Sequence, residues 1–255
     1  MRIIQITDLH VGRSGENPFG VDVRANFRQV LNAACRTSPF CLVLSGDLCY
    51  DDGQAEIYRW IRQQLDQTGI PYEIMSGNHD DPVLLAQAFG REHLLKNKEL
   101  FFVKELAGRP VIFLDTTPGI VSAAQQTWLK AQLQQIENEA LVFMHHPPVE
   151  AGVPFMDQRY PLRNRAEVMA ILLAHPYGVN VFTGHYHAEK VVRQGNVVVH
   201  VTPSCFFQIA QQSPDFQVDH YRIAYRQIDW EDGLMQNAVH YLEGVRTAEG
   251  RADED

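Results

Sequence analysis

Several features that would point to other classes of protein are missing from this sequence of 255 residues. No apolar run is long enough to span a membrane. The chain opens with "RIIQITD", which is typical of a strand and not of a secretory signal segment. The four cysteines form no Cys-x-x-Cys pair, so we do not expect a structural zinc site made of thiolates. These absences favour a reduced, cytoplasmic protein without a membrane partner.

Positive charge is also scarce. Asp and Glu outnumber Lys and Arg by 31 to 22, which gives a formal net charge of -9 at pH 7. Proteins that bind nucleic acid usually carry a basic patch, so a nucleic-acid partner is not expected. The acidic balance is still compatible with a phosphate substrate, because bound cations can supply positive charge locally.

Short apolar runs rich in β-branched residues are present, and amphipathic segments separate them through the first two thirds of the chain. This alternation predicts a layered α/β domain. Two helices are expected to begin at capping boxes, Ser122 with Gln125 and Asn164 with Glu167. The expected strands cover residues 2–6, 41–45, 72–76, 111–115, 141–145, 179–184 and 197–201.

From about residue 196 onward the pattern becomes all-strand, which predicts a second, more antiparallel sheet. No internal repeat and no low-complexity linker divides the chain. We therefore expect one domain over residues 1–243, followed by a polar, flexible tail over residues 244–255.

Five of the expected strands end in side chains that bind metals. The carboxyl ends of strands form the ligand-binding edge of open α/β sheets, so these side chains are expected at one edge. Each has an ordinary interpretation by itself, as a turn residue or a core histidine. Asp80 and Asp81 precede Pro82, and either is expected to cap a helix. The metal-binding candidates are Asp8, His10, Asp47, Asn78, His145, His185 and His187.

The chemistry of this set indicates the kind of metal. Carboxylate, amide and imidazole ligands suit borderline divalent ions such as Mn, Fe, Zn or Co. Seven ligands are too many for one ion but suit two ions that share a bridging carboxylate. Paired metals about 3.5–4 Å apart are a common device for hydrolysing phosphate esters.

The order and spacing of these residues, through about residue 190, resemble the signature of the calcineurin-like metallophosphoesterases. With His-His-Pro-Pro at 145–148, the sequence resembles the bacterial class III cyclic nucleotide phosphodiesterases. The later stretches "TPSCFFQ", "SPDF" and "YRIAYRQIDWEDG" are similar too. The stretches "GDLCYDDG" and "SGNHDD" depart from the protein Ser/Thr phosphatases of the same superfamily. The resemblance implies an α/β fold, a four-layer αββα sandwich of two mixed β-sheets flanked by helices.

The resemblance also implies roles for the candidate residues. One metal would be held by Asp8, His10, Asp47 and His187, and the other by Asp47, Asn78, His145 and His185. A hydroxide between the metals would be the nucleophile. The catalytic His79 would bind the phosphate or protonate the leaving group. Substrate contacts are expected from His10, Asp47, Asn78, His79 and His187. His146 is an alternative to His145 as ligand.

The activity implied by the resemblance is hydrolysis of 3′,5′-cyclic nucleotides such as cyclic AMP to 5′-monophosphates. A glycerophosphodiesterase or a broad phosphodiesterase or phosphatase is the alternative, and a nuclease or a non-catalytic binding module is less favoured. The expected partner is a small, nucleotide-like phosphodiester, and a homodimer or larger homo-oligomer is compatible with the family. Residues expected in loops around the substrate are Arg13, Asn17, Phe155, Met156 and Arg159.

Overall fold

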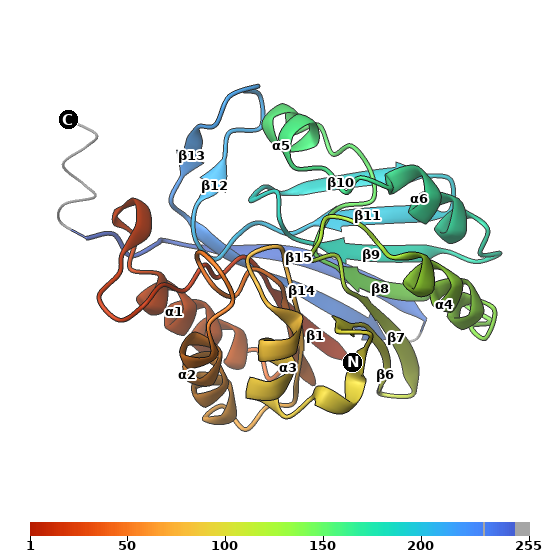
Figure 1. Ribbon diagram of the computed structural model, residues 1–255, viewed down its shortest axis with the longest axis horizontal. Coiled ribbons are helices and arrows are strands. Elements are labelled where there is room, and N and C mark those ends of the chain that lie inside the picture. The colour runs from red at the N-terminus through yellow and green to blue at the C-terminus, as the bar shows by residue number, and fades with distance from the viewer. Residues whose placement is uncertain (232, 248–255) are drawn as a thin grey trace.

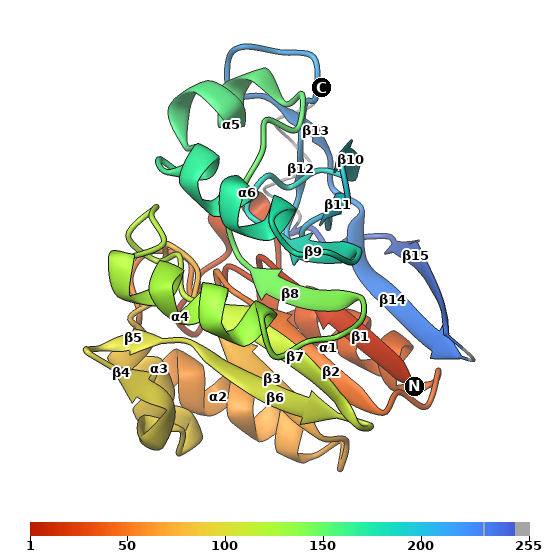
Figure 2. The same ribbon diagram turned by 90° about the vertical axis from the view of Figure 1, so that its right-hand side faces the viewer.

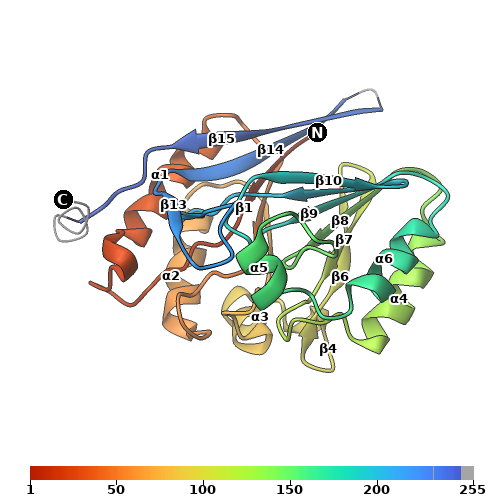
Figure 3. The same ribbon diagram turned by 90° about the horizontal axis from the view of Figure 1, so that it is seen from above.

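Two β-sheets lie face to face between two groups of helices in the computed structural model, which describes residues 1–231 and 233–247 (Figure 1). Seen from above, α1–α3 and the pair α4 and α6 lie on opposite sides of the sheets (Figure 3). This is the four-layer αββα sandwich predicted from the sequence, and that prediction is confirmed. No helix in the described residues is long and apolar enough to cross a membrane.

The first sheet carries the N-terminal strand at its centre. Its strand order is β15-β14-β1-β2-β3, and β1, β2 and β3 run parallel while β14 runs antiparallel to β1. The strands are Leu234–Leu242, Ile223–Glu231, Arg2–Ile6, Cys41–Ser45 and Tyr72–Met75, in that order. The helices that cover it are α1 (Val23–Cys35), α2 (Ala55–Asp66) and α3 (Pro82–Phe89).

The second sheet has the strand order β10-β11-β9-β8-β7-β6, with parallel strands in the middle and antiparallel strands at both edges. The strands are Lys190–Gln194, Val197–Val201, Val179–Thr183, Ala140–Met144, Arg109–Leu114 and Phe102–Leu106, in that order. Its outer face is covered by α4 (Ala123–Leu133) and α6 (Arg165–Leu173).

The alternation of side chains along β7 shows how the core is divided. Val111 and Phe113 pack between the two sheets, whereas Ile112 and Leu114 pack under α4 and α6. On the inner face, rings from neighbouring strands stack in a ladder with centroid distances of 4.7, 5.4, 5.2 and 4.8 Å. The ladder runs through Phe102, Phe113, Phe143, Phe182 and His200.

Short elements complete the fold around the strand ends. Two of them, α5 and the β12–β13 hairpin, lie together at one end of the sandwich (Figure 1; Figure 2). These elements are η1 (Pro18–Gly20), η2 (Glu92–Leu94), β4 (Leu95–Lys96), β5 (Glu99–Leu100), α5 (Pro154–Arg159), β12 (Gln208–Ile209) and β13 (Val218–His220).

The C-terminal strands differ from the prediction. They do not form a sheet of their own, because β11 pairs with β9 in the second sheet while β14 and β15 extend the first. The free edge of β1 requires partners for its backbone groups, and β14 supplies them. The strand expected within "SCFFQIA" is reduced to β12, and the edge strands β6 and β10 were not predicted.

The helix starts agree with the sequence at two of three positions. The Ser122 hydroxyl accepts the Gln125 amide hydrogen at 3.2 Å and caps α4, and Asp81 caps α3. The expected cap at Asn164 is wrong. Its side chain accepts from the Val121 amide at 3.1 Å and donates to the Val121 carbonyl at 2.8 Å, so it ties two loops together.

The beginning of the expected tail is held by the body of the protein. The Val245 carbonyl accepts from Asp22, the Val245 amide donates to Asn26, and Thr247 donates to the Gly20 carbonyl. Residues 245–247 are therefore paired with the rest of the domain, and residues 248–255 lie outside the described residues. One domain over residues 1–243 stays a prediction.

Candidate metal centre

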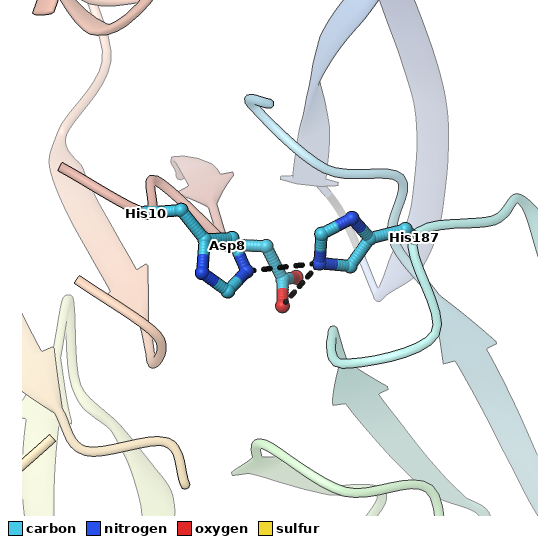
Figure 4. Close-up of side chains that lie close together, drawn as sticks. All are labelled: Asp8, His10 and His187. Carbon is cyan, nitrogen blue, oxygen red and sulfur yellow. Dashed lines mark hydrogen bonds and ion pairs between the residues drawn. The ribbon is translucent and has the colours of Figure 1, made fainter. Parts of the chain in front are cut away.

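The ends of β1 and β9 bring three of the predicted ligands together. Asp8 and His10 follow β1, and His187 follows β9. The Nε2 atoms of His10 and His187 lie 3.0 Å apart, and His187 Nε2 lies 3.5 Å from an Asp8 carboxylate oxygen (Figure 4). One ligand atom from each residue lies within 4.8 Å of the others, as a single metal ion requires.

A second cluster consists of Asp47, His145 and His185, with ligand atoms again within 4.8 Å of one another. Asp47 Oδ2 lies 3.2 Å from His145 Nε2 and 3.8 Å from His10 Nε2. The same carboxylate oxygen therefore faces both clusters. This is the position that the sequence analysis predicted for a bridging carboxylate.

The backbone at these residues is unusual. Asp8, His10, Asp47, His185 and His187 all have positive φ angles, between 45° and 66°. Residues other than glycine rarely adopt this left-handed conformation, and such strain clusters at functional sites. Two residues that lie two apart in an extended chain point to the same side, and the sequence predicts this arrangement for His185 and His187. This prediction is wrong, because β9 ends at Thr183 and left-handed turns present both rings.

Two glycines allow the ligand loops to approach closely. A Cβ at Gly184 would collide with Thr7 and the Asp8 carboxylate, and a Cβ at Gly77 would collide with the Asp47 carboxylate. The carboxylates also hold neighbouring backbone groups. Asp8 accepts the His185 amide hydrogen at 3.0 Å, and Asp47 accepts that of His79 at 2.9 Å.

Backbone carbonyls orient three of the imidazoles. His145 Nδ1 lies 2.9 Å from the Ser45 carbonyl oxygen, His187 Nδ1 lies 3.0 Å from that of Phe207, and His185 Nε2 lies 2.9 Å from that of Tyr160. A carbonyl only accepts, so each of these nitrogens carries the proton. When such a ring is neutral, its opposite nitrogen carries the lone pair that a metal binds.

The pKa values of the histidines follow from burial and from the two carboxylates. Burial lowers the pKa of His10 to about 3 and that of His185 to about 4, so both rings are neutral at pH 7. Burial also disfavours charge on His145, but Asp47 and Asp8 outweigh it and raise its pKa to about 9. Asp47 is therefore paired with a protonated His145 ring, and a divalent cation bound there would displace that proton.

The donor set fits divalent metals. Imidazole nitrogens and carboxylate oxygens converge in each cluster, and the clusters contain no thiolate. This composition suits borderline ions such as Mn, Fe, Zn and Co. The residues present can therefore hold the two metals that the sequence implied.

Two further residues, Asn78 and His79, follow β3 and line a cavity that opens over the clusters. Asn78 is exposed there. His79 Nδ1 lies 2.9 Å from the Asp51 carbonyl oxygen, and the ring centroids of His79 and His10 are 4.9 Å apart. A nitrogen of His79 also lies within 4.8 Å of ligand atoms from His10 and Asp47. The catalytic candidate is therefore beside the clusters.

The neighbouring residue His146 is placed differently from His145. Its Nδ1 lies 2.8 Å from the Thr116 hydroxyl, and its ring packs against His185 with centroids 4.1 Å apart. His146 packs against the His185 ring and belongs to neither of the two clusters. The geometry favours His145 over His146 as the ligand.

Asp80 has a role that the sequence did not reveal. Its carboxylate accepts the backbone amides of Leu48, Cys49 and Gly77 at 2.9–3.2 Å, and the Tyr58 hydroxyl at 2.9 Å. Burial, with the nearby Asp47 charge, raises its pKa to about 6. Asp80 thus ties the loop that carries Asp47 to the loop that carries Asn78, and it does not cap α3.

A cavity of about 550 Å³ opens over the clusters. Phe155 and Met156 line it, as predicted, but Arg13, Asn17 and Arg159 do not. Both arginines are exposed: Arg13 donates to the Gln54 side chain at 3.2 Å, and Arg159 lies at the end of α5. The sequence did not predict the aromatic lining of the cavity, to which the Phe206-Phe207 pair of "TPSCFFQ" belongs. This lining consists of Phe19, Tyr50, Tyr160, Phe206, Phe207 and Phe216.

Residues 1–189, which include every predicted ligand, match the model of the calcineurin-like phosphoesterase family. The chain belongs to this family. The resemblance drawn from the five strand ends is therefore confirmed, and with it the metallophosphoesterase fold.

Relatives and a solved structure extend the comparison. The chain is 34% identical to a probable cyclic nucleotide phosphodiesterase of Fibrobacter succinogenes over 94% of each protein. It is 27% identical to a 3′,5′-cyclic adenosine monophosphate phosphodiesterase of Escherichia coli K12, over all of this chain and 94% of that protein. A glycerophosphodiester phosphodiesterase of Enterobacter lignolyticus is 26% identical over 95% and 94%. A dimetal phosphatase from Danio rerio shares the fold, with a TM-score of 0.68, 15% identity and coverage of 96% and 98%.

Proposed function

We propose that this protein is a dinuclear metal-dependent phosphodiesterase that hydrolyses 3′,5′-cyclic nucleotides to nucleoside 5′-monophosphates. The observation that carries the proposal is the position of Asp47, whose Oδ2 faces His10 Nε2 at 3.8 Å and His145 Nε2 at 3.2 Å. A shared carboxylate between two imidazole-rich clusters is the arrangement that paired metals require.

The ligands divide into two sets around this carboxylate. Asp8, His10, Asp47 and His187 would hold one metal, and Asp47, Asn78, His145 and His185 the other. When bound, Mn, Fe, Zn or Co ions supply Lewis-acid activation of water and of the phosphoryl oxygens. Backbone carbonyls fix the orientation of His145, His187 and His185, and left-handed turns carry Asp8 and Asp47.

His79 is proposed to protonate the leaving oxygen. The Asp51 carbonyl accepts from Nδ1, so the ring is held with Nε2 available on the other side. A protonated His79 can then donate its Nε2 hydrogen to the ribose 3′-oxygen as the phosphorus–oxygen bond breaks. Contacts to the bound phosphodiester are proposed for His10, Asp47, Asn78, His79 and His187.

The relatives support a small phosphodiester as the substrate. Two of them are named as cyclic nucleotide phosphodiesterases and match nearly the whole chain. A relative named as a glycerophosphodiester phosphodiesterase supports the second candidate substrate class. We further propose a cytoplasmic enzyme that uses neither nucleic acid nor membrane as partner, in a homodimer or larger homo-oligomer.

A substrate panel tests the proposal. Metal-loaded protein is offered cyclic AMP, cyclic GMP, glycerophosphocholine and single-stranded DNA, and kcat/KM is compared. The highest value is expected for a cyclic nucleotide. A higher value for glycerophosphocholine would transfer the proposal to glycerophosphodiesters, and preferred cleavage of DNA would contradict both.

A further inference from the structure

Aromatic side chains from separate segments meet beside the predicted metal ligands. Phe206 packs against His10 with ring centroids 5.3 Å apart, and Phe207 packs against His187 at 5.2 Å. Phe19 lies 5.9 Å from Phe206 and 5.0 Å from Phe207. Phe19 is therefore one ring further from the clusters than its two neighbours.

The aromatic surface continues across the cavity. Phe216, between β12 and β13, lies 5.8 Å from Phe19, and Phe155 of α5 lies 5.7 Å from Phe216. Tyr160 follows at 5.6 Å from Phe155. We call this set the aromatic wall; its members are Phe19, Phe155, Tyr160, Phe206, Phe207 and Phe216.

The aromatic wall offers ring faces on which a flat ligand can stack. Neighbouring rings contact one another and are tilted by 45–76°, so each presents its own face or edge to the cavity. A planar ring gains stacking and burial energy against such faces.

Three members of the wall are exposed to an extent that folding alone does not explain. Phe19, Tyr160 and Phe216 are 47%, 53% and 42% exposed, and they are three of the seven large apolar side chains exposed in the described residues. Phe19 also has φ 53° and ψ 27°, which is strained for a bulky residue. Strain that holds an apolar ring toward solvent indicates a ligand that covers it.

The charge of the cavity indicates that the ligand has no second anionic group besides its phosphodiester. None of the residues that line the cavity, all within the described part of the chain, is Lys or Arg. Asp51 adds a carboxylate to the lining of the cavity. A second anionic group beyond the phosphodiester would therefore find no positive partner, whereas an uncharged ring meets no such penalty.

We propose that the aromatic wall binds the nucleobase of a cyclic nucleotide, with its face on one of the tilted rings of Phe19 and Phe216 and its edge against the other, while the phosphodiester lies over the two clusters. The ribose would span the width of Phe206 and Phe207. The proposal rests on the proposed function and gives it a substrate class: esters that carry a planar heteroaromatic base, in preference to glycerophosphodiesters.

Paired substrates test the role of Phe19 and Phe216. The comparison uses cyclic AMP and 1-O-methylribose 3′,5′-cyclic phosphate, which lacks the base. We expect Phe19→Ala and Phe216→Ala each to lower kcat/KM for cyclic AMP by about 5- to 100-fold, the range for loss of one stacked base. The base-free substrate should change by about twofold or less. Equal losses on both substrates, or no loss on either, would overturn the proposal.

Phe40→Ala is the matched control, because Phe40 is 45% exposed and precedes β2, at the end of the strand opposite to Asp47. It should leave both substrates unchanged. Calorimetry on the metal-loaded wild type separates this proposal from the proposed function: adenosine 5′-monophosphate should bind more tightly than ribose 5-phosphate. Equal affinities would exclude base binding even if cyclic AMP is hydrolysed. Tighter binding of the nucleotide without hydrolysis of cyclic AMP would instead contradict only the proposed reaction.

Discussion

At the scale of single residues, Asp47 is shared by both clusters. Its Oδ2 lies 3.2 Å from His145 and 3.8 Å from His10, while its Oδ1 accepts a backbone hydrogen from His79. Removal of this carboxylate leaves both sets of imidazoles short of a ligand and of negative charge. Removal of an imidazole from one cluster leaves the other set complete.

We therefore expect Asp47→Ala to lose both metals and His187→Ala to lose mainly one. Metal content and activity are measured on purified variants as metal is titrated back. Asp51→Ala removes a nearby exposed carboxylate outside the predicted ligand set and should retain both metals. If Asp47→Ala regains full activity at modest metal excess, Asp47 does not bridge.

A second prediction concerns His79. A ribose 3′-alkoxide needs a proton to leave, whereas a nitrophenolate leaves without one. General acid catalysis contributes about 10²–10⁴-fold where a proton is needed, so His79→Ala should slow cyclic AMP hydrolysis by that factor. Hydrolysis of a nitrophenyl phosphodiester should slow only mildly, and metal content should stay near that of the wild type.

The outcome separates three roles for His79. Equal losses of kcat/KM on both substrates would mean that the ring binds the phosphate or shapes the site. Loss of one metal would make it a ligand, which its proximity to His10 and Asp47 allows. Only the unequal loss supports a proton donor.

At the scale of elements, the ladder of rings on the inner face of the second sheet ties its strands together. Phe143 is fully buried and stacks on Phe113 at 5.4 Å and on Phe182 at 5.2 Å. Phe143→Ala should lower the free energy of unfolding by about 3–5 kcal/mol, through lost burial and the cavity it leaves. Phe40→Ala, on the surface, should change it by about 0.5 kcal/mol or less. Urea titrations of metal-free protein compare them, and equal effects would contradict a role of the ladder in stability.

The end of the same ladder predicts a pH dependence of stability. Burial, with the nearby Arg226 charge, lowers the pKa of His200 to about 4 from the usual 6.5. The folded state therefore binds fewer protons than the unfolded state between these values, so stability falls as pH falls from 6.5 to 4. The slope from this residue is at most about 1.4 kcal/mol per pH unit. His200→Gln should flatten the measured slope, and an unchanged slope would place the acid sensitivity elsewhere.

The elements near the site were predictable to different degrees. The central strands and the residues that follow them could be predicted from the sequence, because their apolar β-branched runs end at Gly, Asp, Asn or His. The edge strand β6 could not be predicted in this way. Its sequence "FVKEL" mixes polar and apolar residues, as strands at an exposed sheet edge do. The left-handed turns at Asp8 and His185 could not be predicted from the sequence either. Nothing in these side chains requires that conformation, and tertiary contacts impose it.

At the scale of the whole molecule, the site is assembled from both halves of the chain. Asp8 and Asp47 come from the first sheet, whereas His145 and His187 come from loops of the second sheet. The ligand set was predictable because all seven ligands follow one of five strand ends. The aromatic wall was not predictable, because Phe19, Phe155 and Phe216 lie far apart in sequence. Only the packing of η1, α5 and the segment between β12 and β13 brings them together.

The central claim is that two metals, held by the seven predicted ligands, make the chain a phosphodiesterase. A metal titration tests this claim most directly. Metal-free protein is titrated with Mn²⁺ while bound metal and hydrolysis of cyclic AMP are followed together. The account predicts that activity rises with occupancy and reaches its maximum at two metal ions per chain. Full activity at one ion per chain, or in metal-free protein, would contradict it.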